Sequence, residues 1–299
     1  MDRLQAMTTF VAVVDGGSFA SAARKLNLSP PVVTRAVAEL EERLQLRLLT
    51  RTTRMVRVTE AGARYAEDCR RILAEIEAAE SAAAGTHGAP RGTLTLTAPV
   101  LFGQMYVTPV LVRYLQRYPE VDAQCLFLDR VVNLMEEGVD VAVRIAELPD
   151  SSLQAVRVGR VRRVLMAAPA YLAAHGTPRR PEDLAGHTTV SAAGLSAQLE
   201  WRFSVDGRPR TQPVVPRMRT TTNDSAISAA LAGLGIARLL SYQAAPHVAA
   251  GTLVPVLQEF EAAPLPIHVV HHEGRRATQK VRNFVDMAIE SLRADPALR

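Results

Sequence analysis

The residue types with the clearest chemistry are hydroxyl and arginine side chains near the start of the chain. One set recurs at i, i+3, i+4 and i+7, namely Pro31, Thr34, Arg35 and Ala38. A helix would place these four on one face, which no carboxylate interrupts. A helix that reads base edges needs small residues for close approach and a few donors such as threonine and arginine. The pattern favours a helix that lies in a DNA groove, although an ordinary amphipathic helix pair shows the same spacing.

A basic segment follows directly. Residues 43–59 contain five arginines and no acidic residue. Two β-prone runs, 46–49 and 55–59, flank residues 50–54, which predicts a β-ribbon wing. Arg51, Thr53 and Arg54 would present their donors at its tip to phosphate oxygens or a minor groove. A basic run is usually a solvated surface, but its place directly after the helix pair favours the wing.

Two short helices and a tight turn must position these residues. Ser18 follows two glycines and can cap the first helix, which Asn27 can end in a left-handed conformation. Ser29 can cap the second helix, with Pro30 at its first position, and it joins the candidate DNA-contacting residues. An earlier apolar stripe over residues 4–14 predicts a further helix that packs against this pair.

A longer helix is predicted from about residue 63 to residue 84. Its apolar and small residues are spaced as a heptad seam, which consists of Tyr65, Cys69, Ile72, Ile76, Ala79 and Ala83. Nothing obvious in a single chain would cover this seam, so we expect it to pair with a second copy. The alternative is a helix that packs on its own C-terminal domain. Cys69 fits a small core residue better than a reactive thiol.

Beyond a Gly- and Pro-containing linker at 85–92, strands and helices alternate. The first unit has predicted strands at 93–97, 121–128 and 139–145 and predicted helices at 102–118 and 131–137. The second has strands at 163–168, 201–205, 218–222 and 235–240 with helices at 171–175 and 224–234, and a strand at 267–271 and a terminal helix follow. This order predicts parallel sheets with helices on their faces. The expected domains are 1–60, 61–91 and 92–299, the last with lobe I at 92–161 and 267–299 and lobe II at 162–266.

Two such lobes would enclose a ligand cleft beyond the ends of their strands. The residues expected to line it are Pro99, Val100, Leu101, Phe102, Leu128, Arg144 and Ile145 on one wall and Thr221, Thr222 and Asn223 on the other. Free N–H groups at a helix start suit a carboxylate. Asp224 weakens that argument, because it can cap the helix itself.

With its predicted elements in this order, the sequence resembles the LysR-type transcriptional regulators over essentially the whole chain. The residues that carry the resemblance are FVAVVDGGSFASAARKLNLSPPVVTRAVAELEERL, LRLLTRTTRMVRVTEAG, RYPEVDAQCLFLDR, EEGVDVAVRIA, AAPAYLAAHGTPRRPEDLAGH and LAGLGIA. The resemblance implies a winged helix-turn-helix, a dimerising linker helix and a two-lobed α/β effector domain similar to periplasmic binding proteins. It also implies dimers or tetramers on double-stranded DNA and a small-molecule effector that controls transcription.

Dimers would place two recognition helices in successive major grooves, which predicts an interrupted palindromic operator. The chain departs from the family's frequent residues at several positions, namely Pro31, Thr34, Ala36, Gln45, Thr50 and Asn133. Ala36 stands where glutamine is common and Gln45 where glycine is usual. These departures bear on the operator sequence rather than on the class of activity.

Composition excludes several other classes. Hydrophobic residues make up 48% and the net charge is only +5, so the chain is globular and its basic character is local. Two cysteines cannot form a disulfide framework, and neither a secretory signal nor an apolar stretch long enough for a membrane is evident. We therefore expect a cytoplasmic protein.

No catalytic constellation is recognisable, and neither an enzyme nor a cofactor is predicted. The cluster of His268, His271, His272 and Glu273 lacks further ligands, so solvated histidines are favoured over a metal site. An architectural DNA-binding protein without a ligand is a third reading, but it would not need two α/β lobes.

Overall fold

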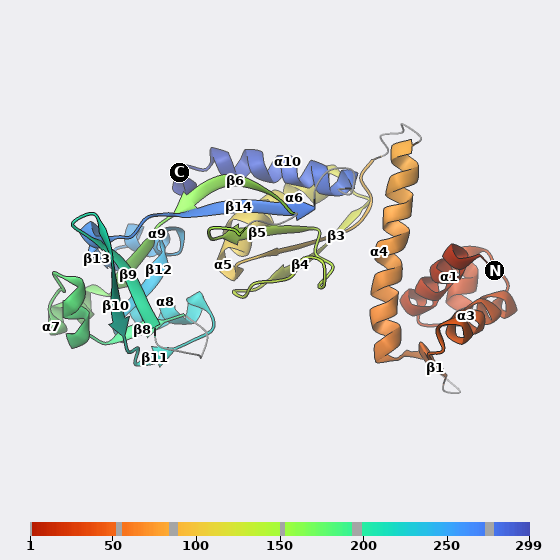
Figure 1. Ribbon diagram of the computed structural model, residues 1–299, viewed down its shortest axis with the longest axis horizontal. Coiled ribbons are helices and arrows are strands. Elements are labelled where there is room, and N and C mark those ends of the chain that lie inside the picture. The colour runs from red at the N-terminus through yellow and green to blue at the C-terminus, as the bar shows by residue number, and fades with distance from the viewer. Residues whose placement is uncertain (1, 52–55, 84–88, 150–152, 193–198, 273–277) are drawn as a thin grey trace. The chain divides into compact units, whose positions relative to one another are not determined.

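The computed structural model describes residues 2–51, 56–83, 89–149, 153–192, 199–272 and 278–299. The chain forms two compact units, residues 1–92 and 93–299, which Figure 1 shows as ribbons. Each unit has its own apolar core, and the two are described separately.

The first unit is a winged helix-turn-helix followed by a long helix. Its elements are α1 (Arg3–Gly16), α2 (Phe19–Leu26), α3 (Pro30–Leu44), β1 (Leu49–Arg51), β2 (Val56–Val58) and α4 (Glu60–Ala83). Both predicted ends of α2 are confirmed by their caps. The Ser18 hydroxyl accepts a hydrogen bond from the Ser21 N–H at 3.1 Å, and Asn27 ends α2 in the left-handed region with φ at 54°.

The start of α4 is held by Thr59 and Gly62. The Thr59 hydroxyl accepts from the Gly62 N–H at 2.9 Å and donates to the Arg47 carbonyl at 2.8 Å. A Cβ atom at Gly62 would lie 2.0 Å from the Leu48 carbonyl oxygen. Glycine is therefore the residue that lets α4 begin so close to the strand that leads into the wing.

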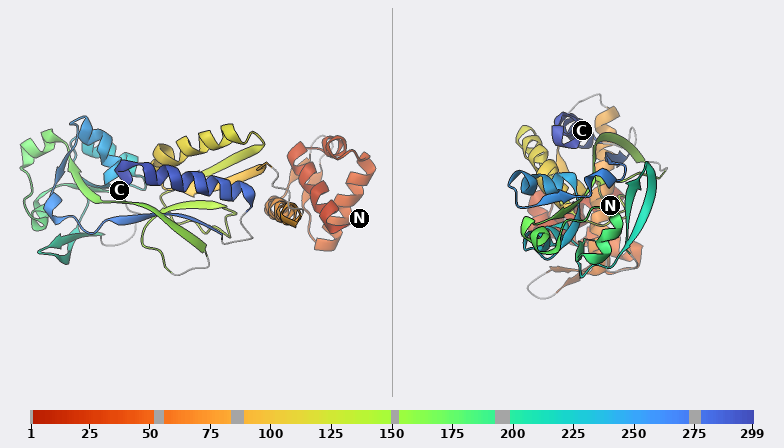
Figure 2. Two further views of the ribbon diagram at one scale, coloured as in Figure 1. Left: turned by 90° about the horizontal axis from the view of Figure 1, so that it is seen from above. Right: turned by 90° about the vertical axis from the view of Figure 1, so that its left-hand side faces the viewer.

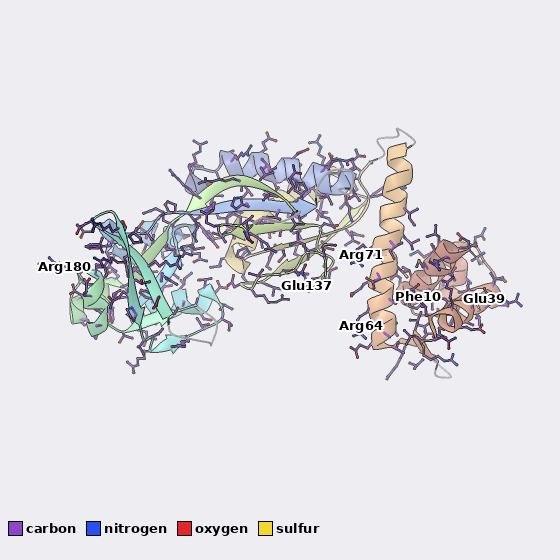
Figure 3. All side chains as sticks on the ribbon, viewed as in Figure 1. Phe10, Glu39, Arg64, Arg71, Glu137 and Arg180 are labelled. Atoms are coloured by element: carbon purple, nitrogen blue, oxygen red, sulfur yellow. The ribbon has the colours of Figure 1, made fainter. Side chains whose placement is uncertain are left out.

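The first turns of α4 pack on their own domain. Figure 3 shows Phe10 turned toward α4, and its ring centroid lies 5.8 Å from that of Tyr65. Cys69 is fully buried in the same core, and Arg70 forms an ion pair with Asp15 on α1 at 2.5 Å. The expectation that a second copy covers Cys69 is therefore wrong, because α1 of the same chain already covers it. Burial raises the pKa of the Cys69 thiol, as expected for a core residue.

The rest of the predicted seam is only partly described. Ile72 is half-buried against the same core. Ile76 lies one turn further along and is half-buried outside that core. Ala79 and Ala83 belong to α4, but their side chains lie outside the described part of the chain.

Lobe I of the second unit is a five-stranded mixed sheet in the order β4-β3-β5-β14-β6. Its strands are β3 (Gly92–Ala98), β4 (Val121–Phe127), β5 (Val141–Ile145), β6 (Leu153–Val161) and β14 (Leu265–His272). The helical segments are α5 (Val100–Phe102), a π-helical stretch (Gly103–Val107), α6 (Thr108–Arg117), α10 (Gln279–Ala294) and a short 3₁₀ turn (Pro296–Leu298). Helices α6 and α10 lie side by side (Figure 2), and both bury apolar faces in the lobe I core.

Lobe II has a second five-stranded mixed sheet in the order β11-β8-β12-β7-β13. Its elements are β7 (Arg163–Ala167), α7 (Pro169–His175), β8 (Thr189–Ser191), β11 (Met218–Arg219), α8 (Asn223–Leu231), β12 (Ile236–Leu240), α9 (Ser241–Ala249) and β13 (Val254–Val256). A separate hairpin of β9 (Leu199–Val205) and β10 (Arg208–Val214) adds Trp201 and Phe203 to the core. Two 3₁₀ turns complete the lobe, Pro181–Gly186 and Gln258–Phe260.

The predicted two-lobed α/β arrangement is confirmed, but the sheets are not fully parallel. In lobe I, β3 and β5 are parallel, whereas β14 runs antiparallel to both β5 and β6. In lobe II, β12 is parallel to β8 and antiparallel to β7. The sequence order alone did not predict β6, which connects the two lobes and pairs with β14.

The helix predicted at residues 131–137 is wrong, since this segment forms turns. Side chains supply its hydrogen bonds in place of a helical backbone. Arg130 forms a bidentate ion pair with Glu137 at 2.7 and 2.9 Å. The Asn133 side chain accepts from the Met135 N–H at 3.2 Å, which is a turn geometry.

The crossing between the lobes is fixed by hydrogen bonds and by one aromatic residue. The Ser241 N–H donates to the Arg162 carbonyl at 2.8 Å, and the Arg162 N–H donates to the Ser241 hydroxyl at 3.1 Å. The next residue, Tyr242, belongs to lobe II in sequence but is buried in the lobe I core. Helix α9 therefore begins in contact with both lobes.

Candidate nucleic-acid interface and interlobe site

The predicted groove face lies on the exposed side of α3. Pro31, Arg35 and Ala38 are exposed and Thr34 is half-buried. The opposite side of the helix packs into the core through a separate set, Val33, Ala36, Val37 and Leu40. Ala36 is fully buried, so it is a packing position in this chain and not part of the exposed face.

The start of α3 leaves a hydroxyl group available. Ser29 occupies the N-cap position and is exposed, but its side chain makes no capping hydrogen bond. Pro30 at the first helical position removes one backbone donor that would need a partner. The hydroxyl of Ser29 can therefore donate to a ligand next to the exposed face without breaking a bond within the domain.

The wing is present as a two-stranded antiparallel ribbon. Leu49 pairs with Val58, Thr50 with Arg57 and Arg51 with Val56. Arg51 is thus the last residue of β1 rather than part of the predicted tip segment 50–54, while Thr53 and Arg54 fall outside the described residues.

The first strand begins three residues later than its predicted run, at a point held by Glu41, which sequence reasoning did not single out. Its buried carboxylate accepts the N–H groups of Leu48 and Leu49 at 2.7 and 2.9 Å, so it fixes the wing to the C-terminal half of α3. The signal that could have found it is a carboxylate on the apolar side of the predicted helix.

The interlobe candidates are brought together around Asp129, which the sequence did not mark. Its carboxylate accepts from the Val100 N–H at 3.0 Å and from the Asn223 side-chain amide at 3.3 Å. Pro99 and Val100 are half-buried, and Leu101 packs against the cores of both lobes. The loop after β4 and the start of α8 therefore meet at one carboxylate.

On the lobe II side, the predicted residues form the start of α8. Thr221 is exposed, and the Thr222 hydroxyl lies 3.0 Å from that of Ser225. Thr222 and Asn223 are both half-buried. Their side chains are hydrogen-bonded within the chain in this arrangement.

Two predicted cleft residues, Phe102 and Leu128, have other roles. Phe102 is fully buried, stacks on Tyr106 with ring centroids 4.8 Å apart and meets Tyr242 edge-on at 5.3 Å, so the prediction that it lines the cleft is wrong. Burial raises the pKa of the Tyr242 hydroxyl. Leu128 is half-buried against a small satellite cluster of lobe I.

Arg144 and Ile145 cannot line the same wall. Successive residues of a strand point to opposite faces, and Ile145 packs against the main lobe I core. Arg144 instead donates to the Val132 carbonyl at 2.5 Å, where it holds the 131–138 turns. Ile145 thus packs in the core beneath the cleft wall. Arg144 is no longer a candidate effector-binding residue.

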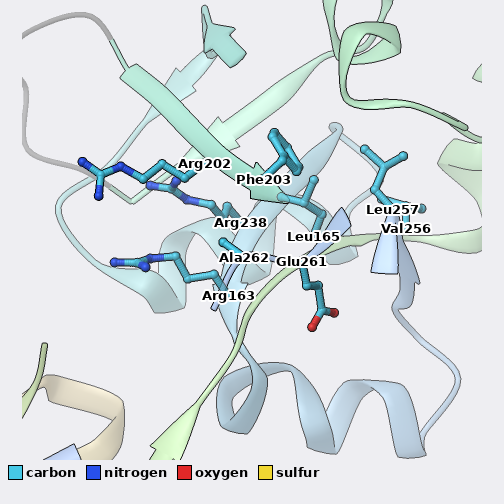
Figure 4. A pocket seen from close by; sticks show the side chains of 9 residues that line it. All are labelled: Arg163, Leu165, Arg202, Phe203, Arg238, Val256, Leu257, Glu261 and Ala262. Atoms are coloured by element: carbon cyan, nitrogen blue, oxygen red, sulfur yellow. The ribbon is translucent and has the colours of Figure 1, made fainter. Parts of the chain in front are cut away.

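A third group of residues was missed entirely. Three arginines, Arg163, Arg202 and Arg238, line one pocket in lobe II, as Figure 4 shows. They come from strands β7, β9 and β12, so their distance in sequence hides the cluster.

Two family models match the chain, one over the helix-turn-helix part and one over the two-lobed part. Residues 4–63 match the model of the bacterial regulatory helix-turn-helix proteins of the lysR family. Residues 87–293 match the model of the LysR substrate binding domain. The chain belongs to the LysR family of transcriptional regulators.

Relatives of this LysR-type regulator match along nearly their whole length. The transcriptional regulator CrgA of Neisseria meningitidis is 33% identical over 96% of this chain and 96% of its own length. The transcriptional activator AaeR of Escherichia coli is 30% identical over 96% of this chain and 93% of its own. These relatives are named as regulators rather than as enzymes.

Solved structures agree with the fold of this LysR-type regulator. The structure of CrgA has a TM-score of 0.62 at 32% identity and covers 96% of this chain and 98% of that one. The full-length structure of AphB, a Vibrio cholerae virulence activator, has a TM-score of 0.62 at 28% identity, with 97% and 99% covered.

Two further sequence expectations concern membranes and metals. No described helix is long and apolar enough to cross a membrane. Within the described residues, no three histidine, cysteine or acidic side chains lie close enough to hold a metal ion. In the predicted histidine cluster, His271 is buried and the side chain of His272 lies outside the description.

Proposed function

We propose that this LysR-type regulator binds an interrupted palindromic DNA operator and that a small molecule between the two lobes controls this binding. The observation that carries the DNA-binding half is the exposed face of α3. Arg35 has no partner among the described residues, and the neighbouring side chains are short. A guanidinium in this position can reach the edges of bases, because Ala38 leaves room for close approach.

The wing and the start of α3 support a second kind of contact. Arg51, Thr53 and Arg54 would bind phosphate oxygens or the minor groove, and the Ser29 hydroxyl would bind a phosphate beside the recognition helix. These contacts fix the position of the helix and carry no base specificity of their own. Since the exposed face of α3 offers few long donors, much of the discrimination would come from paired half-sites and DNA shape.

The experiment for DNA binding compares Arg35→Ala with Arg208→Ala. Arg208 is exposed on the lobe II hairpin, so it is matched in charge and remote from the helix-turn-helix in sequence. We expect Arg35→Ala to reduce discrimination between operator and scrambled DNA by about 1–3 kcal/mol, measured by fluorescence anisotropy at fixed salt. Arg208→Ala should leave it unchanged. Equal discrimination in wild type and Arg35→Ala would refute the assigned face.

The interlobe half of the proposal rests on Asp129 and its two donors. The hydrogen bonds of Asp129 join the loop after β4 to the start of α8. A molecule that binds between these segments would therefore change the contact between the two lobes. Asp129 accepts the Val100 N–H and the Asn223 side-chain amide, so a negative charge already lies beside the start of α8, where an effector carboxylate would bind. This favours an effector with a hydrogen-bond donor and an apolar part over a simple carboxylate, which would have to displace Asp129 against charge repulsion.

A metabolite panel tests this half separately. We expect a matching compound to raise the Tm of the full chain by mass action and Asn223→Ala to abolish that rise, while Ser228→Ala, at an exposed position of α8 outside the predicted site, keeps it. A panel that stabilises neither protein, together with normal operator binding, would favour a DNA-binding protein that needs no effector.

A further inference from the structure

A pocket in lobe II gathers three arginines around apolar walls. The arginines are Arg163, Arg202 and Arg238, and the remaining lining residues are Leu165, Phe203, Val256, Leu257, Glu261 and Ala262. Figure 4 shows the three guanidinium ends side by side on one side of the pocket, while the Glu261 carboxylate points elsewhere.

The sheet register explains why these side chains meet. Arg238 on β12 lies opposite Leu165 on β7, and Leu165 lies opposite Val256 on β13. Because cross-strand partners share a face, the three form one row across the sheet. Arg163 lies two residues before Leu165 and therefore faces the same way. The β9 strand then contributes Phe203 and Arg202 to the same pocket.

The positive charge of this pocket is not balanced within the chain. Among the described residues, no carboxylate forms an ion pair with any of the three arginines. Glu261, which also lines the pocket, is engaged by Arg162 at 2.6 Å. Three like charges therefore converge without a counterion from the residues that surround them.

One further observation shows that the arrangement is costly in the absence of a ligand. Burial, and then the charge of Arg163, lowers the pKa of Arg238 to about 10. Arg238 also lies over the Trp201 ring, with its central carbon 5.4 Å from the ring centroid. This cation–π contact is favourable, and it places the fully buried Trp201 ring beside one of the three arginines.

We propose that lobe II carries a second ligand site, in which Arg163, Arg202 and Arg238 bind a small oxyanion with several oxygens, a polycarboxylate or a phosphate. Guanidinium groups bind such oxygens through paired N–H donors. An anion of more than one charge suits three arginines better than a single carboxylate does. Because the cavity itself measures only about 10 Å³ and Arg202 is exposed, the anion would lie at the mouth of the pocket, against the guanidinium groups.

This site is separate from the proposed interlobe site by residue. All nine lining residues fall between positions 163 and 262, and none of them belongs to the set around Asp129 and Asn223. The regulator would then respond to two chemically different molecules, one between the lobes and one anion held by lobe II alone.

Trp201 provides a direct readout, because the chain has one tryptophan. The full chain is titrated with citrate or with inorganic phosphate at an ionic strength held constant with NaCl, and Trp201 fluorescence and Tm are recorded. We expect a saturable fluorescence change and a rise in Tm with at least one of the two anions. The anion that gives the lower midpoint distinguishes the polycarboxylate from the phosphate.

Matched variants identify the groups responsible. Arg202 is exposed, so Arg202→Gln should fold, and we expect it to weaken binding at least about tenfold, as the loss of a charged hydrogen bond does. Arg208→Gln, on the same hairpin, should leave the midpoint unchanged, as should Asn223→Ala in the interlobe site. Arg238→Gln should lose the anion-dependent rise in Tm while unfolding no earlier than wild type without anion.

Several results would overturn the second site. They are a response that NaCl alone reproduces, equal midpoints for wild type and Arg202→Gln, or neither a fluorescence change nor a rise in Tm with either anion. A response that scales with protein concentration would assign the arginines to a contact between copies. An equal loss in Asn223→Ala would mean that the anion binds between the lobes, which refutes a separate site without refuting the proposed interlobe function.

Discussion

At the scale of single residues, Glu41 connects the exposed face of α3 to the wing. Its side chain is 8% exposed, yet it accepts two backbone N–H groups and contacts Arg47 at 3.3 Å. The N–H groups of Leu48 and Leu49 would otherwise lie buried without acceptors. Glu41, a charged residue on the apolar side of α3, is therefore the hydrogen-bond acceptor that holds the start of the wing.

We expect Glu41→Ala to destabilise the N-terminal unit by about 2–3 kcal/mol, because it leaves two buried donors unpaired. Urea unfolding followed by circular dichroism measures this loss. Glu42→Ala is the matched control, since Glu42 is exposed on the same helix, and it should shift the free energy of unfolding by less than about 0.5 kcal/mol. Equal unfolding midpoints for the two variants would contradict the role of Glu41.

At the scale of elements, the sequence predicted what local patterns determine. Ser18 and Asn27 mark the ends of α2 because their side chains and backbone preferences act within a few residues. The face of α3 predicted from the spacing of Pro31, Thr34, Arg35 and Ala38 likewise lies on the side of the helix turned away from the core. The helix at 131–137 was wrong because the Arg130–Glu137 pair and the Asn133 turn compete with a helical backbone.

Contacts between distant segments could not be read from spacing. The heptad seam was read as a site for a second copy, although its first residues meet α1, more than fifty positions earlier in the chain. Asp129 and the three lobe II arginines escaped notice for the same reason, since each depends on which strands become neighbours. Arg144 was misassigned because neighbouring residues of a strand point to opposite faces of the sheet, so Arg144 and Ile145 cannot line the same wall.

The junction of the wing and α4 gives a prediction at this scale. Gly62→Ala should destabilise the N-terminal unit by at least about 2 kcal/mol, since a Cβ 2.0 Å from the Leu48 carbonyl forces the backbone to move. Thermal unfolding measures the effect. Gly186→Ala is the control, because a Cβ there meets no atom within 4 Å. Unchanged stability in Gly62→Ala would show that α4 can begin elsewhere.

At the scale of the whole molecule, α4 divides into two parts. Its first turns are covered by α1 of the same chain, whereas Ile76 lies beyond that core. We infer that self-association uses the second part of the helix, from Ile76 onward. This narrows the predicted dimer seam to Ile76 and the seam residues that follow it.

Ile76→Asp is therefore expected to shift the regulator from dimers or tetramers toward monomers, because it introduces a charge into an apolar seam. Sedimentation velocity of the full chain measures the change. Glu67→Ala, at an exposed position of the same helix, should leave the assembly intact. An unchanged sedimentation coefficient in Ile76→Asp would place the contact between copies elsewhere.

The packing of α1 on α4 also has a mechanical consequence. Because Phe10, Cys69 and the Arg70–Asp15 ion pair join the two helices, α4 and the recognition helix must turn together as one lever. The arm is long, since 24 residues of α-helix span about 36 Å. A tilt of about 5° at one end moves the other by about 3 Å, which is close to the rise of one base pair. In a dimer, a small rotation of the two α4 helices would thus be enough to change which bases the two recognition helices can reach at the same time.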